Sequence, residues 1–96
     1  MKLWVDDLRD PPDDTWTVAR SSDEAILHLT TRRWQTMSLD HDLGGDDNTR
    51  FVIRHLCENP DLWPTEVRVH TANNVGRTWL IGMIGRYAPE ETRLRR

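Results

Sequence analysis

The chain has 96 residues, of which 36% are hydrophobic and 30% charged, and its formal net charge is −3 at pH 7. This length suits a single domain, residues 1–96, near the lower end of what buries a self-sufficient core. The net negative charge argues against bulk, sequence-independent binding of nucleic acid. No apolar run approaches the roughly 20 residues that a membrane span requires, so we expect a soluble, cytoplasmic protein without a membrane partner. The single cysteine, Cys57, excludes an intramolecular disulfide and a cysteine-based zinc cluster.

The first third of the chain is predicted to contain two strands and a helix. The strands are Lys2–Asp6 and, with a weaker pattern, Trp16–Ala19, and a proline- and aspartate-rich loop joins them. Parallel strands usually need a crossover of a dozen or more residues. Because residues 7–15 are too few, we expect the first crossover helix to be missing or the second strand to be an irregular edge. Ser21 then fits a capping box that opens a helix running to about Arg33.

The rest of the chain alternates strands with helices. We expect strands at Gln35–Leu39 and Glu66–His70, a helix that Asp46 or Asp47 caps, and a last helix that Asn73 or Asn74 caps. Such alternation predicts a three-layer α/β fold with a mostly parallel sheet of four strands. Residues 88–96 are too few and too polar to predict a fifth strand.

Polar residues follow three of these strands at the point where each one ends. They are Asp6-Asp7, Asp40-His41-Asp42 and His70-Thr71-Ala72-Asn73. The carboxyl ends of parallel strands lie at one edge of the sheet, where ligands bind. Clustered carboxylates repel one another unless a cation, a proton or a basic side chain compensates, and hard cations such as Mg²⁺ bind to a few carboxylate oxygens. The sequence therefore predicts a metal site at Asp6, Asp7 and Asp40, although aspartates at turns also serve as simple caps.

Further candidates surround this acidic site. His41, next to Asp42, is either a general base or metal ligand that the carboxylate orients, or a histidine packed under a helix. His70 adds a second titratable ring at a strand end. The start of the last helix favours an anion, and we expect a phosphate to contact side chains from both sides of the site: Arg9, Thr71, Asn73 and Arg77. The alternatives are that Arg9 pairs with Asp10 and that Asn73 only caps the helix.

These motifs together resemble the receiver superfamily, in which an acidic pair ends the first strand, an acceptor aspartate ends the third, and threonine or serine ends the fourth. The chain resembles still more closely a divergent branch, the cyclic-phosphate processing receiver domains. The matching segments are Asp6-Asp7-Leu8-Arg9, Leu39-Asp40-His41-Asp42-Leu43-Gly44 and His70-Thr71-Ala72-Asn73-Asn74-Val75-Gly76. Asn74 stands where that pattern has a proline. The resemblance implies a shortened receiver-like (flavodoxin-like) fold.

The resemblance also implies a function. We expect a metal-dependent phosphoesterase that opens a cyclic phosphate, either a 2′,3′-cyclic RNA end or a cyclic nucleotide, in RNA repair or in a conflict between phage and bacterium. Asp6, Asp7 and Asp40 would hold Mg²⁺ or Mn²⁺, which activates water. His41 and His70 would be the acid–base pair, and Asp42 would orient a histidine. The phosphate would be bound by Arg9, Thr71, Asn73 and Arg77.

Two other functions stay open. The first is a non-catalytic receiver-like module that binds a nucleotide or a partner protein. The second is a phospho-accepting receiver, which is disfavoured because ordinary receivers use a lysine after the fifth strand, and Lys2 is the only lysine among 13 basic residues. A thin sheet that carries five tryptophans also suggests a homodimer.

Overall fold

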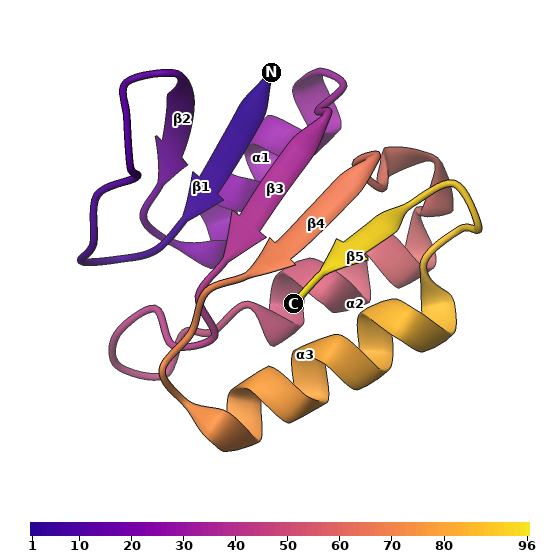
Figure 1. Ribbon diagram of the computed structural model, residues 1–96. Helices are drawn as coiled ribbons and strands as arrows, with labels where there is room; N and C mark the ends of the chain where they lie inside the picture. The colour runs from indigo at the N-terminus through magenta and orange to yellow at the C-terminus, as the bar shows by residue number, and fades with distance from the viewer.

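The computed structural model describes residues 1–96 as a sheet of five strands with three α-helices and one short 3₁₀ helix (Figure 1). All strand pairs are parallel, and the strands lie in the order β2-β1-β3-β4-β5. The elements in chain order are β1 (Lys2–Val5), β2 (Trp16–Ala19), α1 (Ser22–Thr31), β3 (Thr36–Leu39), α2 (Arg50–Glu58), η1 (Pro60–Leu62), β4 (Glu66–Val69), α3 (Asn74–Tyr87) and β5 (Arg93–Arg95).

The sheet has one strand more than the four we predicted, so that prediction is wrong. Strand β5 is only three residues long, but it pairs with β4 along its whole length. The Arg93 amide donates to the Thr65 carbonyl (2.8 Å) and the Thr92 hydroxyl donates to the Pro64 carbonyl (2.9 Å). Leu94 packs against the core while the two flanking arginines stay exposed. The strand escaped prediction because backbone pairing, rather than an apolar sequence, holds it in place.

Residues 6–15 connect β1 to β2 without a helix. The side chain of Arg20 fastens this connection to the sheet. Its guanidinium donates to the carbonyl oxygens of Asp6 (3.2 Å) and Arg9 (2.8 Å) and pairs with Asp10 (2.5 Å). The first half of this loop, which carries the acidic pair, is therefore held in place.

The helices follow one another along one side of the sheet (Figure 1). Each of α1, α2 and α3 joins two parallel strands, and all three steps run in the same direction across the sheet. Since such crossovers are right-handed, the three helices must cover the same face. The predicted three-layer arrangement is therefore wrong, and the molecule has two layers.

The core lies between these helices and the sheet. Alternate strand residues point into it, such as Leu3 and Val5 of β1 and Met37 and Leu39 of β3, all fully buried. They form one cluster of 17 buried residues with the inner faces of α1, α2 and α3. The other strand residues, among them Lys2, point to the second face, which no helix covers.

Two of the three helix caps follow the sequence. Ser21 accepts a hydrogen bond from the Glu24 amide (3.1 Å), and Asn73 accepts one from the Gly76 amide (3.0 Å). The predicted cap of α2 is wrong, since Thr49 occupies the N-cap position. Asp47 instead binds the amide and hydroxyl of Ser22 and so ties the loop before α2 to α1.

No helix of the chain combines the length and the apolar character that crossing a membrane would need.

Candidate functional site

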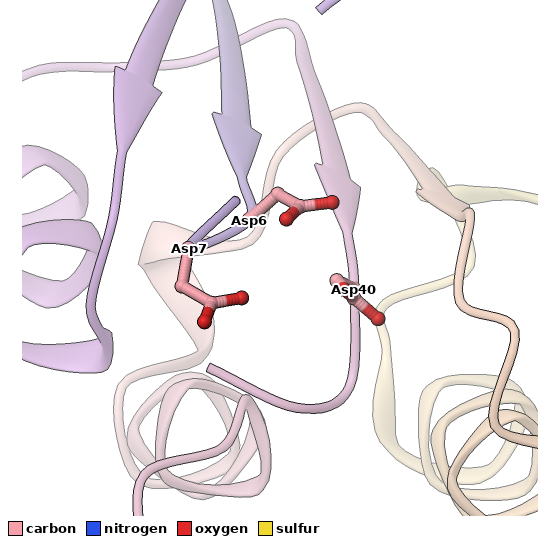
Figure 2. A group of neighbouring side chains, drawn as sticks. All are labelled: Asp6, Asp7 and Asp40. Atoms are coloured by element: carbon pink, nitrogen blue, oxygen red, sulfur yellow. The ribbon is translucent and has the colours of Figure 1, made fainter. Parts of the chain in front are cut away.

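The carboxylates of Asp6, Asp7 and Asp40 come together at the carboxyl ends of β1 and β3 (Figure 2). Each offers an oxygen that lies within 4.8 Å of those offered by the other two. The proximity follows from the sheet, because Val5 and Leu39 are partners in the parallel pairing and the acidic residues come directly after them. The juxtaposition of the three aspartates predicted from the sequence is confirmed.

Asp6 is the buried member of this cluster, with 1% of its side chain exposed. Its Oδ1 accepts hydrogen bonds from the amides of Leu8 and Arg9, both at 2.9 Å. Its Oδ2 lies 3.0 Å from His70 Nε2 and 3.3 Å from Arg9 Nε. Burial by itself raises the pKa of Asp6, but the two amides and His70 together outweigh it, so this pKa lies below its ordinary value. Asp6 is therefore ionised and fixed in position.

Arg9 lies across the mouth of the acidic cluster. Besides Asp6, its guanidinium approaches Asp40 Oδ2 at 3.8 Å and donates to the His70 carbonyl at 2.9 Å. More than half of the side chain is exposed. The predicted alternative, a pair between Arg9 and Asp10, is not formed, because Asp10 pairs with Arg20. Arg9 thus provides the basic compensation that the clustered carboxylates require.

The donor set suits a hard divalent cation. Asp7 makes no side-chain hydrogen bond within the chain, and Asp40 uses one oxygen to accept from the His41 amide (2.7 Å). Both oxygens of Asp7 and Oδ2 of Asp40 therefore accept no hydrogen bond within the chain. Mg²⁺ needs only one or two carboxylates besides water. Gly44 lies against Asp7, with Asp7 Oδ2 3.0 Å from where a Cβ would be, and its φ of +87° favours glycine. Gly44 therefore allows the loop after β3 to approach Asp7 closely.

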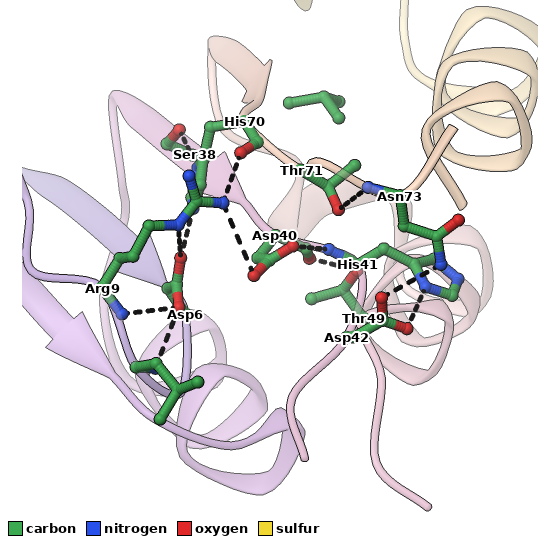
Figure 3. Close-up of polar contacts among 12 residues, drawn as sticks. Asp6, Arg9, Ser38, Asp40, His41, Asp42, Thr49, His70, Thr71 and Asn73 are labelled. Atoms are coloured by element: carbon green, nitrogen blue, oxygen red, sulfur yellow. Dashed lines mark hydrogen bonds and ion pairs between the residues drawn. The ribbon is translucent and has the colours of Figure 1, made fainter. Parts of the chain in front are cut away.

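His70 is held between Asp6 and Ser38 at the end of β4 (Figure 3). Because the Asp6 carboxylate accepts from Nε2, the neutral ring carries its proton there, and Nδ1 accepts from the Ser38 hydroxyl at 2.7 Å. The ring also stacks on Trp4, with centroids 3.9 Å apart and planes at 7°. Burial lowers the pKa of His70 below its ordinary value, and neighbouring Asp6 offsets this only in part.

His41, the other histidine of the predicted acid–base pair, does not face His70. Its side chain is buried between Asp42, Arg50 and Gly76. Arg50 Nε can only donate, so His41 Nε2 accepts from it (2.9 Å), and Nδ1 donates to Asp42 Oδ1 (2.9 Å). Figure 3 shows this ring on the far side of Asp40 from His70. Both ring nitrogens are thus occupied within the protein.

The remaining predicted residues lie at the start of α3 and make local contacts. The Thr71 hydroxyl accepts from the Asn73 amide (3.2 Å), and Asn73 Nδ2 donates to Asp42 Oδ2 (3.0 Å). His41 and Asn73 both hydrogen-bond to Asp42 and keep its pKa below the ordinary value. Arg77 donates to the Val69 carbonyl (3.2 Å). Of the four predicted phosphate ligands, Arg9 is the one that contacts the acidic cluster.

Sequence reasoning missed several residues that position the site. Ser38 and Trp4 orient His70, Arg50 orients His41, and the Thr49 hydroxyl donates to the Asp40 carbonyl at 2.7 Å. Ser38 carried a usable signal, since it is a polar residue between the buried apolar positions Met37 and Leu39. Nothing in the sequence indicated the stacking of Trp4, because the two rings meet only through strand pairing.

Comparison with known proteins assigns the chain to a family. No curated protein and no solved structure matches the chain. A family model described as "Cyclic-phosphate processing Receiver domain" matches residues 1–86, a span that includes β1 to β4, α1, α2, all of α3 but its last residue, and every residue of the acidic cluster. The chain belongs to the family of cyclic-phosphate processing receiver domains.

Proposed function

We propose that the protein is a metal-dependent phosphoesterase that opens a cyclic phosphate, with a 2′,3′-cyclic RNA end or a cyclic nucleotide as the substrate. The observation that carries this proposal is the joining of two features at one sheet edge. Three carboxylates lie within 4.8 Å of one another, and one of them is hydrogen-bonded to an imidazole. A charge-neutralising centre and a proton-transfer group are what phosphodiester hydrolysis needs side by side.

The reaction adds one water to the ring. The water oxygen forms a new bond to phosphorus, one of the two ring P–O bonds breaks, and the departing alkoxide takes up a proton. The product is a phosphomonoester with a free hydroxyl beside it. No redox step is involved, so the protein has to supply an activated water, positive charge near the phosphoryl oxygens and a proton for the leaving group.

Asp6, Asp7 and Asp40 would hold Mg²⁺ or Mn²⁺. When bound, such an ion lowers the pKa of its water and neutralises charge on the phosphoryl oxygens. Arg9 is oriented by Asp6 and Asp40 and would donate to the same phosphoryl oxygens. Its exposed guanidinium can change partners from the carboxylates to a phosphate without disturbing the core.

His70 is the proton-transfer group of this proposal. Its lowered pKa keeps the ring neutral at neutral pH, so that it can accept a proton from the attacking water and return it to the alkoxide. Nε2 is the ring nitrogen that faces the acidic cluster, so the proton would be exchanged there, and the Ser38 hydroxyl can donate to Nδ1 or accept from it as the tautomer changes. In the proposal, His41 and Asp42 position the loop after β3 and the start of α3, because both nitrogens of His41 are already engaged.

A non-catalytic binding module is the competing proposal, and one observation favours it. Arg9 already compensates the charge of Asp6 and Asp40, so the cluster is not forced to bind a metal. Such a module would bind a nucleotide through Arg9 and the start of α3 and release it unchanged.

The test is turnover of a panel of 2′,3′-cyclic and 3′,5′-cyclic nucleotides, followed by phosphorus NMR. Each reaction is run with Mg²⁺, with Mn²⁺ and with EDTA. Asp40→Asn removes a metal ligand, and Asp61→Asn makes the same change at an exposed position on η1. We expect ring opening that needs metal, that Asp40→Asn abolishes, and that Asp61→Asn retains.

Other outcomes are equally informative. Nucleotide binding without turnover, indifferent to EDTA, would replace the phosphoesterase with the binding module. Normal turnover by a folded Asp40→Asn protein would contradict the assignment of the site. Incorporation of phosphate into Asp40 from a small phosphodonor would show a phospho-accepting receiver instead.

A further inference from the structure

The face of the sheet opposite the helices is open and basic over β4 and β5. Arg68, Arg93 and Arg95 are exposed there, and Glu66 is the acidic residue among them. The Glu66 carboxylate pairs with Arg68 (2.8 Å) and approaches Arg95 (3.4 Å). Guanidinium groups therefore outnumber carboxylates on this part of the sheet, although the whole chain is net negative.

Strand pairing aligns part of this surface into a row across the sheet. Ser38 is the register partner of Arg68, and Arg68 is the partner of Arg95. With strands spaced about 4.8 Å apart, the row spans roughly 10 Å from β3 to β5. His70 lies two residues beyond Arg68, so it points to the same side of the strand.

A hollow of about 300 Å³ lies over this row. We name it the basic hollow; its lining residues are Ser38, Arg68, Val69, His70, Arg95 and Arg96. The hollow adjoins the candidate site at His70, which lines the hollow and also hydrogen-bonds to Asp6. The Ser38 side of His70 faces the hollow, while the Asp6 side faces the acidic cluster.

Electrostatic complementarity determines which ligand fits. Guanidinium groups bind phosphates through paired, charge-assisted hydrogen bonds. The aromatic residues of the open face are already covered. Trp4 has the His70 ring stacked on it, and Trp16 is 8% exposed, with Lys2 and Arg68 over its ring. The face therefore offers charge to a sugar-phosphate backbone and no free ring on which a base could stack.

We infer that the basic hollow binds the phosphates that precede the cyclic terminus of an RNA strand, so that the preferred substrate is an RNA 3′ end and not a free cyclic nucleotide. The inference rests on the proposed function for the chemistry at the terminus. It adds a second contact region, whose ligand is the backbone upstream of the ring. The hollow contacts phosphates and not bases, so RNA binding there is independent of the RNA sequence and weakens with added salt.

The first arm of the test is binding without turnover. A fluorescein-labelled hexaribonucleotide that ends in a 2′,3′-cyclic phosphate is titrated with protein in EDTA, and anisotropy is recorded at several salt concentrations. Arg95→Gln and Arg68→Gln each remove one phosphate contact, and Arg86→Gln makes the same charge change on α3, on the helix side. We expect each hollow variant to weaken binding severalfold and to reduce the salt slope by about 0.7. Arg86→Gln should bind like the wild type.

The second arm compares kcat/KM for the cyclic hexanucleotide with kcat/KM for the cyclic mononucleotide of the same base. We expect the wild type to prefer the hexanucleotide at least tenfold and Arg95→Glu to lose that preference. Circular dichroism confirms that each variant is folded.

The outcomes separate this inference from the proposed function. Arginine-dependent binding of the hexanucleotide without any turnover would support RNA binding at the basic hollow and contradict the proposed phosphoesterase activity. Equal turnover of both substrates, unaffected by Arg95→Glu, would support the phosphoesterase activity and contradict RNA binding at the basic hollow. Sedimentation that shows a dimer which Arg95→Glu dissociates, together with no binding of the hexanucleotide, would assign the face to a second copy of the chain and also overturn the inference.

Discussion

Asp6 Oδ2 and His70 Nε2 lie 3.0 Å apart, although the two residues are 64 positions apart in the sequence. Asp6 comes after β1 and His70 after β4, and β3 lies between these strands. The contact therefore reaches across the carboxyl edge of the sheet and joins the acidic cluster to His70, the proposed proton-transfer group. It fixes the His70 tautomer and directs Nδ1 toward Ser38 and the open face.

The buried Asp6 carboxylate should matter for stability as well as for metal binding. Asp6→Ala removes the acceptor of the Leu8 and Arg9 amides and the partner of His70. We expect the free energy of unfolding to fall by about 2–3 kcal/mol, since buried donors lose their partner. Asp6→Asn keeps an oxygen for the two amides and should cost clearly less. Urea denaturation compares them, and equal losses in the two variants would contradict the role given to the backbone bonds.

The lowered pKa of His70 predicts how stability depends on pH in metal-free protein. Below about pH 6.5 the unfolded chain binds a proton at this residue that the folded protein does not. The free energy of unfolding should therefore decrease as the pH falls from 6.5 toward the folded-state pKa, by at most about 1.4 kcal/mol per pH unit. His70→Gln should flatten this dependence. NMR titration of the ring checks the pKa directly, and a midpoint above 6.5 would refute the prediction.

Gly76 allows α3 to pack on His41. A Cβ at this position would lie 2.3 Å from the His41 side chain, so Gly76→Ala forces the ring or the helix to move. We expect a loss of about 1–3 kcal/mol. Gly82 on the same helix has no atom within 4 Å of an added Cβ, so Gly82→Ala should stabilise by up to about 1 kcal/mol. Thermal unfolding measures the stability of both variants against the wild type. A stabilised Gly76→Ala protein would contradict the packing of α3 on His41.

In the proposed function Arg9 and a metal ion compensate the same carboxylates, so removing Arg9 should separate their roles. Arg9→Gln leaves Asp6 and Asp40 without their guanidinium partner. We expect Mg²⁺ to raise the melting temperature of this variant more than that of the wild type, while affinity for a cyclic nucleotide falls. Asp7→Asn removes a carboxylate from the cluster, so Mg²⁺ should raise the melting temperature of this variant less than that of the wild type. A smaller Mg²⁺ effect in Arg9→Gln would show that Arg9 does not compete at this site.

Cys57 should behave as a poorly reactive thiol. Burial raises its pKa above the ordinary value, and neighbouring Glu58 raises it further, so the reactive thiolate is scarce at neutral pH. We expect alkylation by iodoacetamide to be slower than that of a free cysteine at pH 7.5 and to rise with a midpoint above pH 9. Urea should restore the ordinary rate. Rapid alkylation of the folded protein at pH 7 would contradict this placement.

The sequence alone determined the elements and the site residues whose causes are local. Ser21 and Asn73 cap helices through bonds to residues three positions away, and Asp6 and Asp40 were located because each directly follows a short strand of a parallel sheet. The family followed from three motifs in their order along the chain. These features depend on spacing, and spacing is written in the sequence.

Only the tertiary structure decided how these parts meet. Strand β5 exists because β4 offers it backbone partners, and the open face exists because three right-handed crossovers place every helix on one side. Trp4 and Ser38 reach His70 through strand order, which no local pattern encodes. The His41 ring points away from His70 because Arg50 and Asp42 bind both of its nitrogens. Contacts between distant segments depend on the topology of the sheet, and that topology is a property of the whole chain.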